Sequence, residues 1–432
     1  MSRTRPGGHA TATHPTGTPA ERAFLVALRP PDVPRAEAED SLRELHALAR
    51  TARAEVAGSR VFPVRTPNPA TAVGKGQFEQ LAADLAATGA DVAVFDDDLT
   101  PAQARNLARG LQVRVVDRTQ LILDIFAARA RTLEGRLQIE LAQLAYMRPR
   151  LRGLWTHLER QKGGIGLKGP GEKQLELDRR RLDQRLAVLR ADLDDVRRRR
   201  AEQRRGRRRR GWSLVTLVGY TNAGKSTLLN RLASAAVTAD SRLFATLDPT
   251  TRQLPHPNHS PCLLTDTVGF IRKLPHHLVE AFKATLEEVT AADLLLHVVD
   301  ASQPLALAQC DAVERVLADL GALGKSRLVL LNKMDRAPSP ALLQLLRERY
   351  PGALPVSAAT GDGLDRLLAA IADSLHRHAP PATYRIPADA GRLLALLHAE
   401  GRIHARRLYG SWWHVTATLP PALLPRFAPY LK

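Results

Sequence analysis

The stretch Gly219–Thr227, with the sequence GYTNAGKST, constrains the fold more than any other part of the chain. It has the G-x-x-x-x-G-K-[ST] pattern of a phosphate-binding loop, in which Lys225 can reach the β- and γ-phosphates and the Ser226 hydroxyl can bind Mg²⁺. A β-branched apolar run precedes it, and leucines at helical spacing follow it. Because a strand, a glycine loop and a helix N-terminus together favour phosphate, we expect a bound nucleoside triphosphate rather than a chance glycine turn.

The totals favour a multidomain protein with a polyanionic partner. The chain has 432 residues, enough for two to four domains, and a formal net charge of +19. Its two cysteines argue against a disulfide framework or a zinc site, and no run of transmembrane length or signal-peptide core is present in the sequence. We therefore expect a cytoplasmic protein with at most weak membrane association, beginning with a disordered tail at residues 1–20.

Residues 21–118 alternate strand-like and helix-like segments, which predicts a small α/β domain with a parallel sheet. One of its helices is expected to be capped by Thr100, with Pro101 at its first position. The other expected helices cover residues 41–52 and 77–88, and the expected strands cover residues 24–28, 61–64, 92–95 and 113–116. No chemistry is assigned to this domain.

Residues 119–211 have a helical pattern, with leucines three, four or seven apart on both sides of an interruption. This period favours two long helices packed as an antiparallel hairpin. The interruption, residues 161–171, holds five glycines and a proline and cannot continue either helix. It is longer than a hairpin turn requires, so we expect this tip to contact a partner rather than to be a simple flexible turn.

The hairpin ends in an arginine-rich linker, Arg197–Arg210, which contains ten arginines and one acidic residue. A run of charge is often a solvated helix face. This run is denser than such a face needs, and closely spaced arginines repel each other unless phosphates screen them. We therefore expect it to contact a nucleic acid backbone.

Residues 212–378 carry the remaining parts of a nucleotide-binding domain. A short strand ends in Asp266, Thr267, Val268 and Gly269, where the carboxylate can hold Mg²⁺ through water and the Gly269 amide can face the γ-phosphate. The nucleotide-binding set also contains the whole phosphate loop: Gly219, Tyr220, Thr221, Asn222, Ala223, Gly224, Lys225, Ser226 and Thr227.

The tetrad Asn332, Lys333, Met334 and Asp335 determines which base is bound. A carboxylate at Asp335 can accept hydrogen bonds from N1–H and the 2-amino group of guanine, whereas adenine would leave it unpaired. The Asn332 side chain would brace the loop, and the Lys333 stem would cover the ring. One backbone amide of the segment Ser357, Ala358 and Ala359 would face the guanine O6.

The segment between these motifs is expected to act as the first switch. It contributes Phe244, Ala245, Thr246, Leu247 and Asp248 to the expected nucleotide site. Residue type alone does not choose among Thr246, Thr250 and Thr251 as the Mg²⁺ ligand. Many GTPases place a water-orienting glutamine directly after the glycine of the D-x-x-G motif, where this chain has Phe270, so we expect slow hydrolysis without a group from elsewhere.

Taken with the hairpin, these residues resemble the HflX family of translational GTPases from about residue 24 to the carboxyl end. The most specific segments are 163–180 (GGIGLKGPGEKQLELDRR), 219–230, 243–252 and 266–282, with one small departure, a lysine at Lys168 where arginine is usual. The resemblance implies that Thr246 is the Mg²⁺ ligand beside Ser226, and that Lys225, Thr246 and Gly269 act in hydrolysis. It implies that phenylalanine at position 270 is a family trait.

The resemblance also implies a protein, which we expect to be a monomer, that binds the large ribosomal subunit, both its RNA and its protein, and splits stalled or idle ribosomes with GTP. Some relatives also use ATP through their amino-terminal region. The competing hypotheses are an ATP-driven RNA-remodelling protein, which Asp335 disfavours, and a non-hydrolysing RNA-binding scaffold, with which Phe270 is compatible. The expected fold is α/β: a P-loop GTPase domain preceded by the small α/β domain and the hairpin, and followed by a small α/β appendage at residues 379–432.

Overall fold

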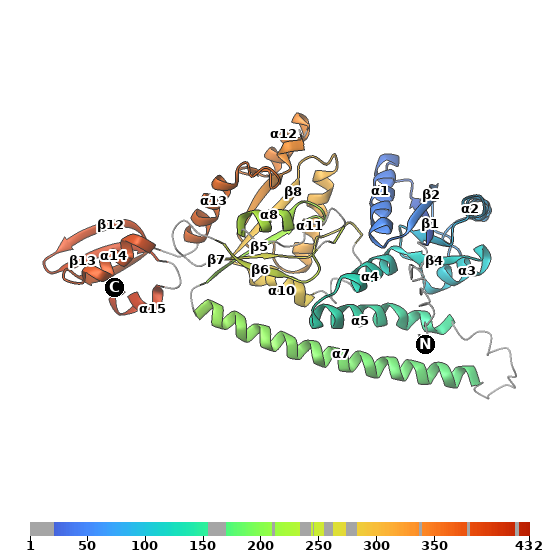
Figure 1. Ribbon diagram of the computed structural model, residues 1–432, viewed down its shortest axis with the longest axis horizontal. Coiled ribbons are helices and arrows are strands. Elements are labelled where there is room, and N and C mark those ends of the chain that lie inside the picture. Colours follow the sequence, from blue (N-terminus) through green and yellow to red (C-terminus); the bar gives the residue numbers. More distant parts are fainter. Residues whose placement is uncertain are drawn as a thin grey trace, which may run out of the picture. The chain divides into compact units, whose positions relative to one another are not determined.

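The computed structural model describes residues 21–153, 170–209, 212–233, 243–244, 246–254, 262–273, 283–336, 339–377, 381–419 and 423–432. The chain divides into two compact units, Met1–Arg118 and Thr119–Lys432 (Figure 1). The expected tail at residues 1–20 lies outside the described residues. The finer domain boundaries at residues 211 and 378 stay predictions.

The first unit is a four-stranded parallel sheet in the order β2-β1-β3-β4. The expected strand at residues 92–95 is present with the same bounds, and Thr100 caps α3 by accepting a hydrogen bond from the Gln103 amide. Its elements are β1 (Arg22–Arg29), α1 (Arg35–Thr51), β2 (Glu55–Pro63), α2 (Lys75–Thr88), β3 (Val92–Phe95), α3 (Pro101–Leu111) and β4 (Arg114–Asp117). Strand β2 begins before the predicted residue 61, because pairing with β1 extends it through Gly58, where a Cβ would lie 2.7 Å from the Phe24 ring.

The second unit begins with helices that form an antiparallel pair. The elements are α4 (Arg118–Arg129), α5 (Leu133–Met147), the 3₁₀ turn η1 (Arg148–Gly153) and α7 (Pro170–Arg209). Ion pairs join these elements: Glu134 with Arg200, Glu140 with Arg185, and Arg148 of η1 with Asp183. The partners follow opposite orders along the chain, so α5 and α7 are antiparallel.

Two details of the expected hairpin were wrong. Only α7, with 40 residues, is long, since α5 has 15 residues and a break at residues 130–132 separates it from α4. Pro170 and Gly171 belong to the first turn of α7, because proline fits the start of a helix where its missing N–H is not needed. The rest of the expected tip, residues 161–169, lies outside the described residues.

The described part of the arginine run, residues 197–209, is the last part of α7 rather than a separate linker. One side of this helical stretch pairs with the protein's own carboxylates: Arg200 with Glu134 of α5 at 2.6 Å, and Arg204 with Glu287 of α10 (Lys283–Ala291) at 2.9 Å. The arginines Arg198, Arg199 and Arg205 are exposed. Part of the run therefore holds α7 to its neighbours, and the exposed part is accessible to other molecules.

The second unit also contains a six-stranded sheet in the order β10-β9-β8-β5-β7-β6. Its strands are β5 (Ser213–Gly219), β6 (Thr250–Leu254), β7 (Cys262–Asp266), β8 (Leu294–Asp300), β9 (Arg327–Asn332) and β10 (Leu354–Pro355), and only β6 pairs antiparallel within this sheet. Its other helices are α8 (Lys225–Ala233), α11 (Ala306–Asp319), the 3₁₀ turn η2 (Met334–Arg336), α12 (Pro340–Arg349) and α13 (Leu364–Arg377). The buried leucines and valines of β5, β7 and β8 form its core with α8 and α13.

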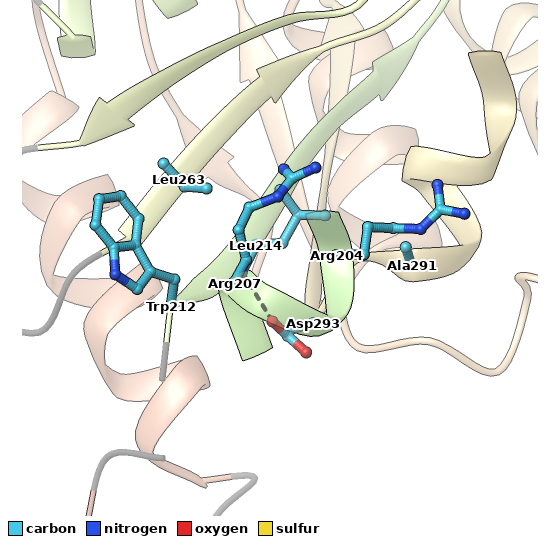
Figure 2. A pocket seen from close by; sticks show the side chains of 7 residues that line it. All are labelled: Arg204, Arg207, Trp212, Leu214, Leu263, Ala291 and Asp293. Atoms are coloured by element: carbon cyan, nitrogen blue, oxygen red, sulfur yellow. Dashed lines mark hydrogen bonds between the residues drawn. The ribbon is translucent and has the colours of Figure 1, made fainter. Parts of the chain in front are cut away.

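A small pocket marks the place where α7 meets this sheet (Figure 2). Arg204 and Arg207 from α7, Trp212, and Leu214 at the start of β5 are among the residues that line it. The Trp212 amide donates to the carbonyl of Arg207, and the Leu214 amide donates to Asp293 at 2.8 Å. The pocket lies at the amino-terminal ends of the strands, so it is at the opposite edge of the sheet from the phosphate loop.

The carboxyl-terminal segment is a three-stranded antiparallel sheet in the order β11-β13-β12 (Figure 1). Its elements are β11 (Ala382–Pro387), α14 (Gly391–Glu400), β12 (Arg402–Tyr409), β13 (Trp412–Thr418), α15 (Leu424–Phe427) and the 3₁₀ turn η3 (Ala428–Tyr430). Leu397 of α14 and Phe427 of α15 pack with Tyr384, Ile386 and Val415, so the helices cover one face of the sheet. Among the described residues, no helix is both long and apolar enough to cross a membrane.

Candidate nucleotide site

The phosphate loop connects the end of β5 to the start of α8, and its glycines are required by close contacts. Gly219 has φ +149°, and a Cβ there would lie 2.3 Å from the carbonyl oxygen of Val298. Gly224 has φ +98°, and a Cβ there would lie 2.3 Å from Nδ2 of Asn332. Both positions therefore exclude a larger side chain, which explains why glycine stands at both ends of the motif.

Lys225 is the first residue of α8, and its ammonium is buried inside the loop. Its Nζ donates to the carbonyl oxygens of Gly219 at 3.0 Å and Tyr220 at 2.7 Å. Burial lowers the pKa of Lys225 to about 8, because an ammonium removed from water loses hydration that the two carbonyls replace only in part. A phosphate group beside this ammonium would supply the missing opposite charge.

Three side-chain oxygens meet next to the loop. The Ser226 hydroxyl lies 2.8 Å from the Thr246 hydroxyl, and both donate to Oδ2 of Asp266, at 2.6 and 2.8 Å. The other oxygen of Asp266 is buried and has no hydrogen-bond partner among the described residues, and burial raises the pKa of this carboxyl. Hydroxyl and carboxylate oxygens are ligands that Mg²⁺ prefers, so this donor set fits that ion.

The structure separates the three switch threonines that the sequence left open. Thr246 lies against Ser226, whereas Thr250 and Thr251 belong to β6, where the Thr251 hydroxyl bonds to that of Thr265 at 2.8 Å. Thr246 is therefore the threonine that the fold brings to the phosphate loop. Thr227, in the first turn of α8, is half-buried, Leu247 is buried, and Ala245 lies outside the described residues.

The switch segment is also attached to the helical part of the same unit. The Phe244 ring is buried at 4.6 Å from the Phe126 ring, and its carbonyl accepts a hydrogen bond from Arg129. Two residues after Thr246, the Asp248 carboxylate accepts hydrogen bonds from the amides of Arg131 and Thr132, each at 3.0 Å, and from the Thr132 hydroxyl. Since Thr132 is the N-cap of α5, Asp248 lies at the N-terminus of that helix.

The second switch motif, residues 266–269, packs against the phosphate loop. Thr267 is buried, with its hydroxyl donating to the Leu217 carbonyl, and Val268 is buried. A Cβ on Gly269 would lie 2.7 Å from Cα of Thr221 and 3.0 Å from Nζ of Lys225, so the backbone here approaches the loop closely. The Phe270 side chain is in the core, and its backbone exchanges hydrogen bonds with Gly219 and Thr221. Phe270 therefore fixes the loop and does not face the place expected for the γ-phosphate.

The side chain of Asn332 connects the phosphate loop to the base-recognition loop. Its Nδ2 donates to the Ala223 carbonyl at 2.8 Å, and its Oδ1 accepts from the Ala358 amide at 3.0 Å. The Lys333 ammonium donates to the Asn222 carbonyl and pairs with Asp300 at 2.7 Å. Sequence reasoning missed Asp300, although its position as the last residue of an apolar strand was visible.

The Asp335 carboxylate is exposed and accepts a hydrogen bond from the Ser357 hydroxyl at 2.6 Å. This hydrogen bond holds the pKa of Asp335 below its usual value, so the acceptor form needed to read guanine is favoured. Met334 precedes it in the 3₁₀ turn. The Ser357 amide donates to the Asp362 carbonyl, and the Ala358 amide donates to Asn332. Of the three amides proposed for the guanine O6, only that of Ala359 therefore has no acceptor among the described residues.

A phosphate loop on a mainly parallel sheet, an oxygen cluster that fits Mg²⁺ and a guanine-type base loop together define a P-loop GTPase. Three family descriptions match the sequence: "GTP-binding GTPase N-terminal" over residues 39–127, "GTP-binding GTPase Middle Region" over residues 129–207, and "50S ribosome-binding GTPase" over residues 214–333. The chain is 46% identical over 408 residues to a GTPase HflX of Magnetococcus marinus, a match that covers 94% of each chain.

It is also 46% identical over 359 residues to the GTPase HflX of Escherichia coli, covering 82% of this chain and 83% of that protein. This chain belongs to the HflX family of GTPases. Among solved structures, the complex of SsGBP with GDP is similar at 25% identity and a TM-score of 0.47, covering 82% of this chain and 98% of the other.

Proposed function

We propose that this GTPase binds the large ribosomal subunit, through both RNA and protein, and uses GTP to split stalled or idle ribosomes. The observation that carries the proposal is the attachment of the switch to the hairpin. Asp248, two residues after Thr246, accepts hydrogen bonds at the N-terminus of α5, and α5 forms ion pairs with α7 through Glu134 and Glu140. A change in the switch can therefore reach the hairpin through a short series of contacts.

The match of residues 214–333 to the "50S ribosome-binding GTPase" description supports the choice of partner. The exposed arginines of α7 support it as well, because a row of guanidinium groups suits the phosphates of ribosomal RNA. Splitting is the part of the proposal taken from family resemblance, and the amino-terminal unit has no role assigned in it.

In this proposal the phosphate-loop amides and Lys225 hold the triphosphate, and Asp335 reads the guanine. Ser226 and Thr246 would bind Mg²⁺, with Asp266 beside them, and the ion would neutralise charge on the phosphates. The amide of Gly269 would face the γ-phosphate. Phe270 cannot orient water, so the isolated protein is expected to hydrolyse GTP slowly, with the activating group supplied by the ribosome or by another part of the chain.

The experiment is co-sedimentation with large subunits in the presence of GDP or a non-hydrolysable GTP analogue, together with phosphate release with and without subunits. We expect binding to be stronger with the analogue, and hydrolysis to be stimulated at least about tenfold, which corresponds to roughly 1.4 kcal/mol of barrier. A Lys225→Ala variant, which removes the ammonium inside the loop, is the control and should lose both effects. Equal binding in both nucleotide states would contradict the proposal.

A further inference from the structure

The three-stranded sheet at residues 382–418 has one face that no helix covers in the described part of the chain. Tyr384, Ile386, Val415 and Ala417 point to the core formed with α14 and α15. Because side chains alternate along a strand, the residues between them point to the opposite face. Strand pairing puts Arg385, His414 and Arg407 opposite one another there, and next to them Pro387, Trp412 and Tyr409.

These side chains form a flat basic and aromatic surface. The Arg385 guanidinium lies 4.4 Å from the centre of the Trp412 ring, and the rings of Tyr409 and His414 are 4.9 Å apart. Arg385, Arg407 and Tyr409 are exposed, Tyr409 to 54%. By strand pairing Arg385, Arg407 and His414 are the basic residues of this face in the described part of the chain, and the three strands contain no acidic residue. A surface of this kind has planar groups for stacking and positive charge for phosphate.

We infer that this face of the β11-β13-β12 sheet binds RNA through unpaired bases. Bases that are not in a helix stack on aromatic rings and on arginine planes, while nearby arginines contact the phosphates. A membrane surface fits less well, because the face described above has no leucine, isoleucine or valine to insert between lipids. The inference deepens the proposed function, on which it rests for the identity of the RNA, by adding a second RNA contact besides α7.

The test is fluorescence anisotropy of the full-length protein with a short labelled single-stranded RNA, and with the same RNA in a duplex. Replacing both Trp412→Ala and Tyr409→Ala should weaken single-strand binding by at least roughly tenfold, since stacking on an aromatic side chain contributes about 1–3 kcal/mol per base. Duplex binding should change little. A Trp412→Phe variant keeps a ring and should restore most of the affinity.

Leu408→Ala is the matched control. Leu408 is 51% exposed and lies beside Tyr409 on β12, but it points to the other face of the sheet, opposite Trp413. Its loss should therefore leave RNA binding unchanged. Unchanged single-strand binding by the double variant, or an equal loss from Leu408→Ala, would overturn the inference. So would binding to anionic vesicles that depends on Trp412 without any RNA binding.

Binding to large ribosomal subunits distinguishes a failure of this inference from a failure of the proposed function. If the double variant binds both large subunits and single-stranded RNA as well as the wild-type protein does, the sheet surface does not bind RNA. The proposed function would still stand. If the wild-type protein fails to bind subunits while Trp412 still determines single-strand binding, the proposed function fails and the RNA surface stands.

Discussion

At the scale of single residues, Thr246 shows how the fold chooses among chemically equivalent groups. Thr246, Thr250 and Thr251 all have a hydroxyl suited to Mg²⁺. Strand β6 removes the last two from the site, because its pairing with β7 directs Thr251 to Thr265. The hydroxyl of Thr246 is left 2.8 Å from that of Ser226. The fold thus brings Thr246, the threonine that the resemblance implied, next to Ser226, and its role as a Mg²⁺ ligand stays a prediction.

The first residue-scale prediction concerns Asp335. In Asp335→Asn the amide can donate to a 2-oxo group but no longer accepts both guanine hydrogens, so preference should move from GTP toward xanthosine triphosphate. The loss of GTP affinity should be roughly 100-fold or more. Competition between the two nucleotides measures it, with Asp362→Asn on the neighbouring loop as a control. Unchanged GTP affinity in the variant would show that Asp335 does not read the base.

The second residue-scale prediction concerns His297, which is buried on β8 against the Tyr350 ring. Burial lowers the pKa of His297 to about 3, and Nδ1 has no hydrogen-bond partner in the described part of the chain. Between about pH 6.5 and 3 the unfolded chain therefore binds a proton that the folded chain does not. Folded stability should fall as the pH falls through this range, by up to about 1.4 kcal/mol per pH unit.

Urea unfolding at several pH values measures this dependence. His297→Phe keeps the ring contact and removes the titrating group, so its stability should fall less steeply with acid than that of the wild type. His46→Asn, which changes an exposed histidine, is the control and should keep the wild-type slope. Parallel curves for His297→Phe and the wild type would mean that other groups cause the acid sensitivity.

At the scale of elements, the junction between the switch and α5 is expected to control hydrolysis more than nucleotide binding. Asp248 accepts from two amides and a hydroxyl at the N-terminus of α5, where negative charge is favoured. In Asp248→Asn this attachment weakens, so Thr246 should be held less firmly. GTP hydrolysis should fall several-fold, while GDP affinity stays close to the wild-type value because GDP lacks the γ-phosphate that the switch senses.

The rate of amide hydrogen exchange in the first turn of α5 is a second measurement, which a change in the nucleotide pocket alone would not affect. It should rise in Asp248→Asn, because the Asp248 carboxylate holds Thr132, the N-cap of α5, and an N-cap residue contributes about 1 kcal/mol to a helix. Glu140→Gln changes a charge farther along α5, where it pairs with Arg185, and should leave hydrolysis unchanged. Equal losses of GTP and GDP binding would place Asp248 in the pocket and not at a junction.

The two sides of α7 should respond differently to substitution. Replacing Arg198, Arg199 and Arg205 by glutamine removes exposed charge, so the dependence of large-subunit binding on salt between about 50 and 200 mM should become less steep, by roughly one unit of slope per lost phosphate contact. Thermal stability should hardly change.

The matched control replaces Arg197, Arg200 and Arg204 by glutamine. These arginines face Glu134, Glu287 and Glu288, and Glu134 is buried with its pKa raised by that burial. Stability should fall in this variant, because carboxylates without partners remain at the helix contact. If both triple variants flatten the salt dependence equally, the division of α7 into two sides is incorrect.

Which elements the sequence could predict depends on how local their signals are. Strand β3 is a short run of buried apolar residues. The start of α3 is marked by two adjacent residues, Thr100 and Pro101. Strand β6 was missed because its sequence, TTRQL, has little apolar content and it is held by pairing with β7. The contact of Asp248 with Thr132 joins residues 116 apart, so no local pattern contains it. The same holds for the ion pairs of Arg200 with Glu134 and of Arg204 with Glu287.

At the scale of the whole molecule, the nucleotide site and the far end of the hairpin are expected to be separable in function. Helix α7 has 40 residues, so it extends over about 60 Å at 1.5 Å per residue. A partner that holds the chain ahead of Pro170 would therefore act far from the phosphate loop. The physical link is α5, which contacts α7 along one side and Asp248 at its N-terminus.

The last prediction tests this separation by replacing residues 161–169 with a four-residue turn. Subunit splitting should be impaired, and stimulation of GTP hydrolysis by large subunits should fall toward the unstimulated rate, because docking can no longer order the switch around Thr246 and Asp266. GTP affinity and unstimulated hydrolysis should stay unchanged, since the phosphate loop, Asp266 and Asp335, which we propose to contact nucleotide, lie at or just after the ends of β5, β7 and β9. A matched variant replaces the same nine residues by a flexible sequence of equal length, which separates the loss of length from the loss of particular side chains. Light scattering of ribosomes and phosphate release measure the two effects. Splitting at the wild-type rate by the shortened protein would remove the tip from the mechanism, and hydrolysis that does not respond to large subunits in the wild type would remove the coupling itself.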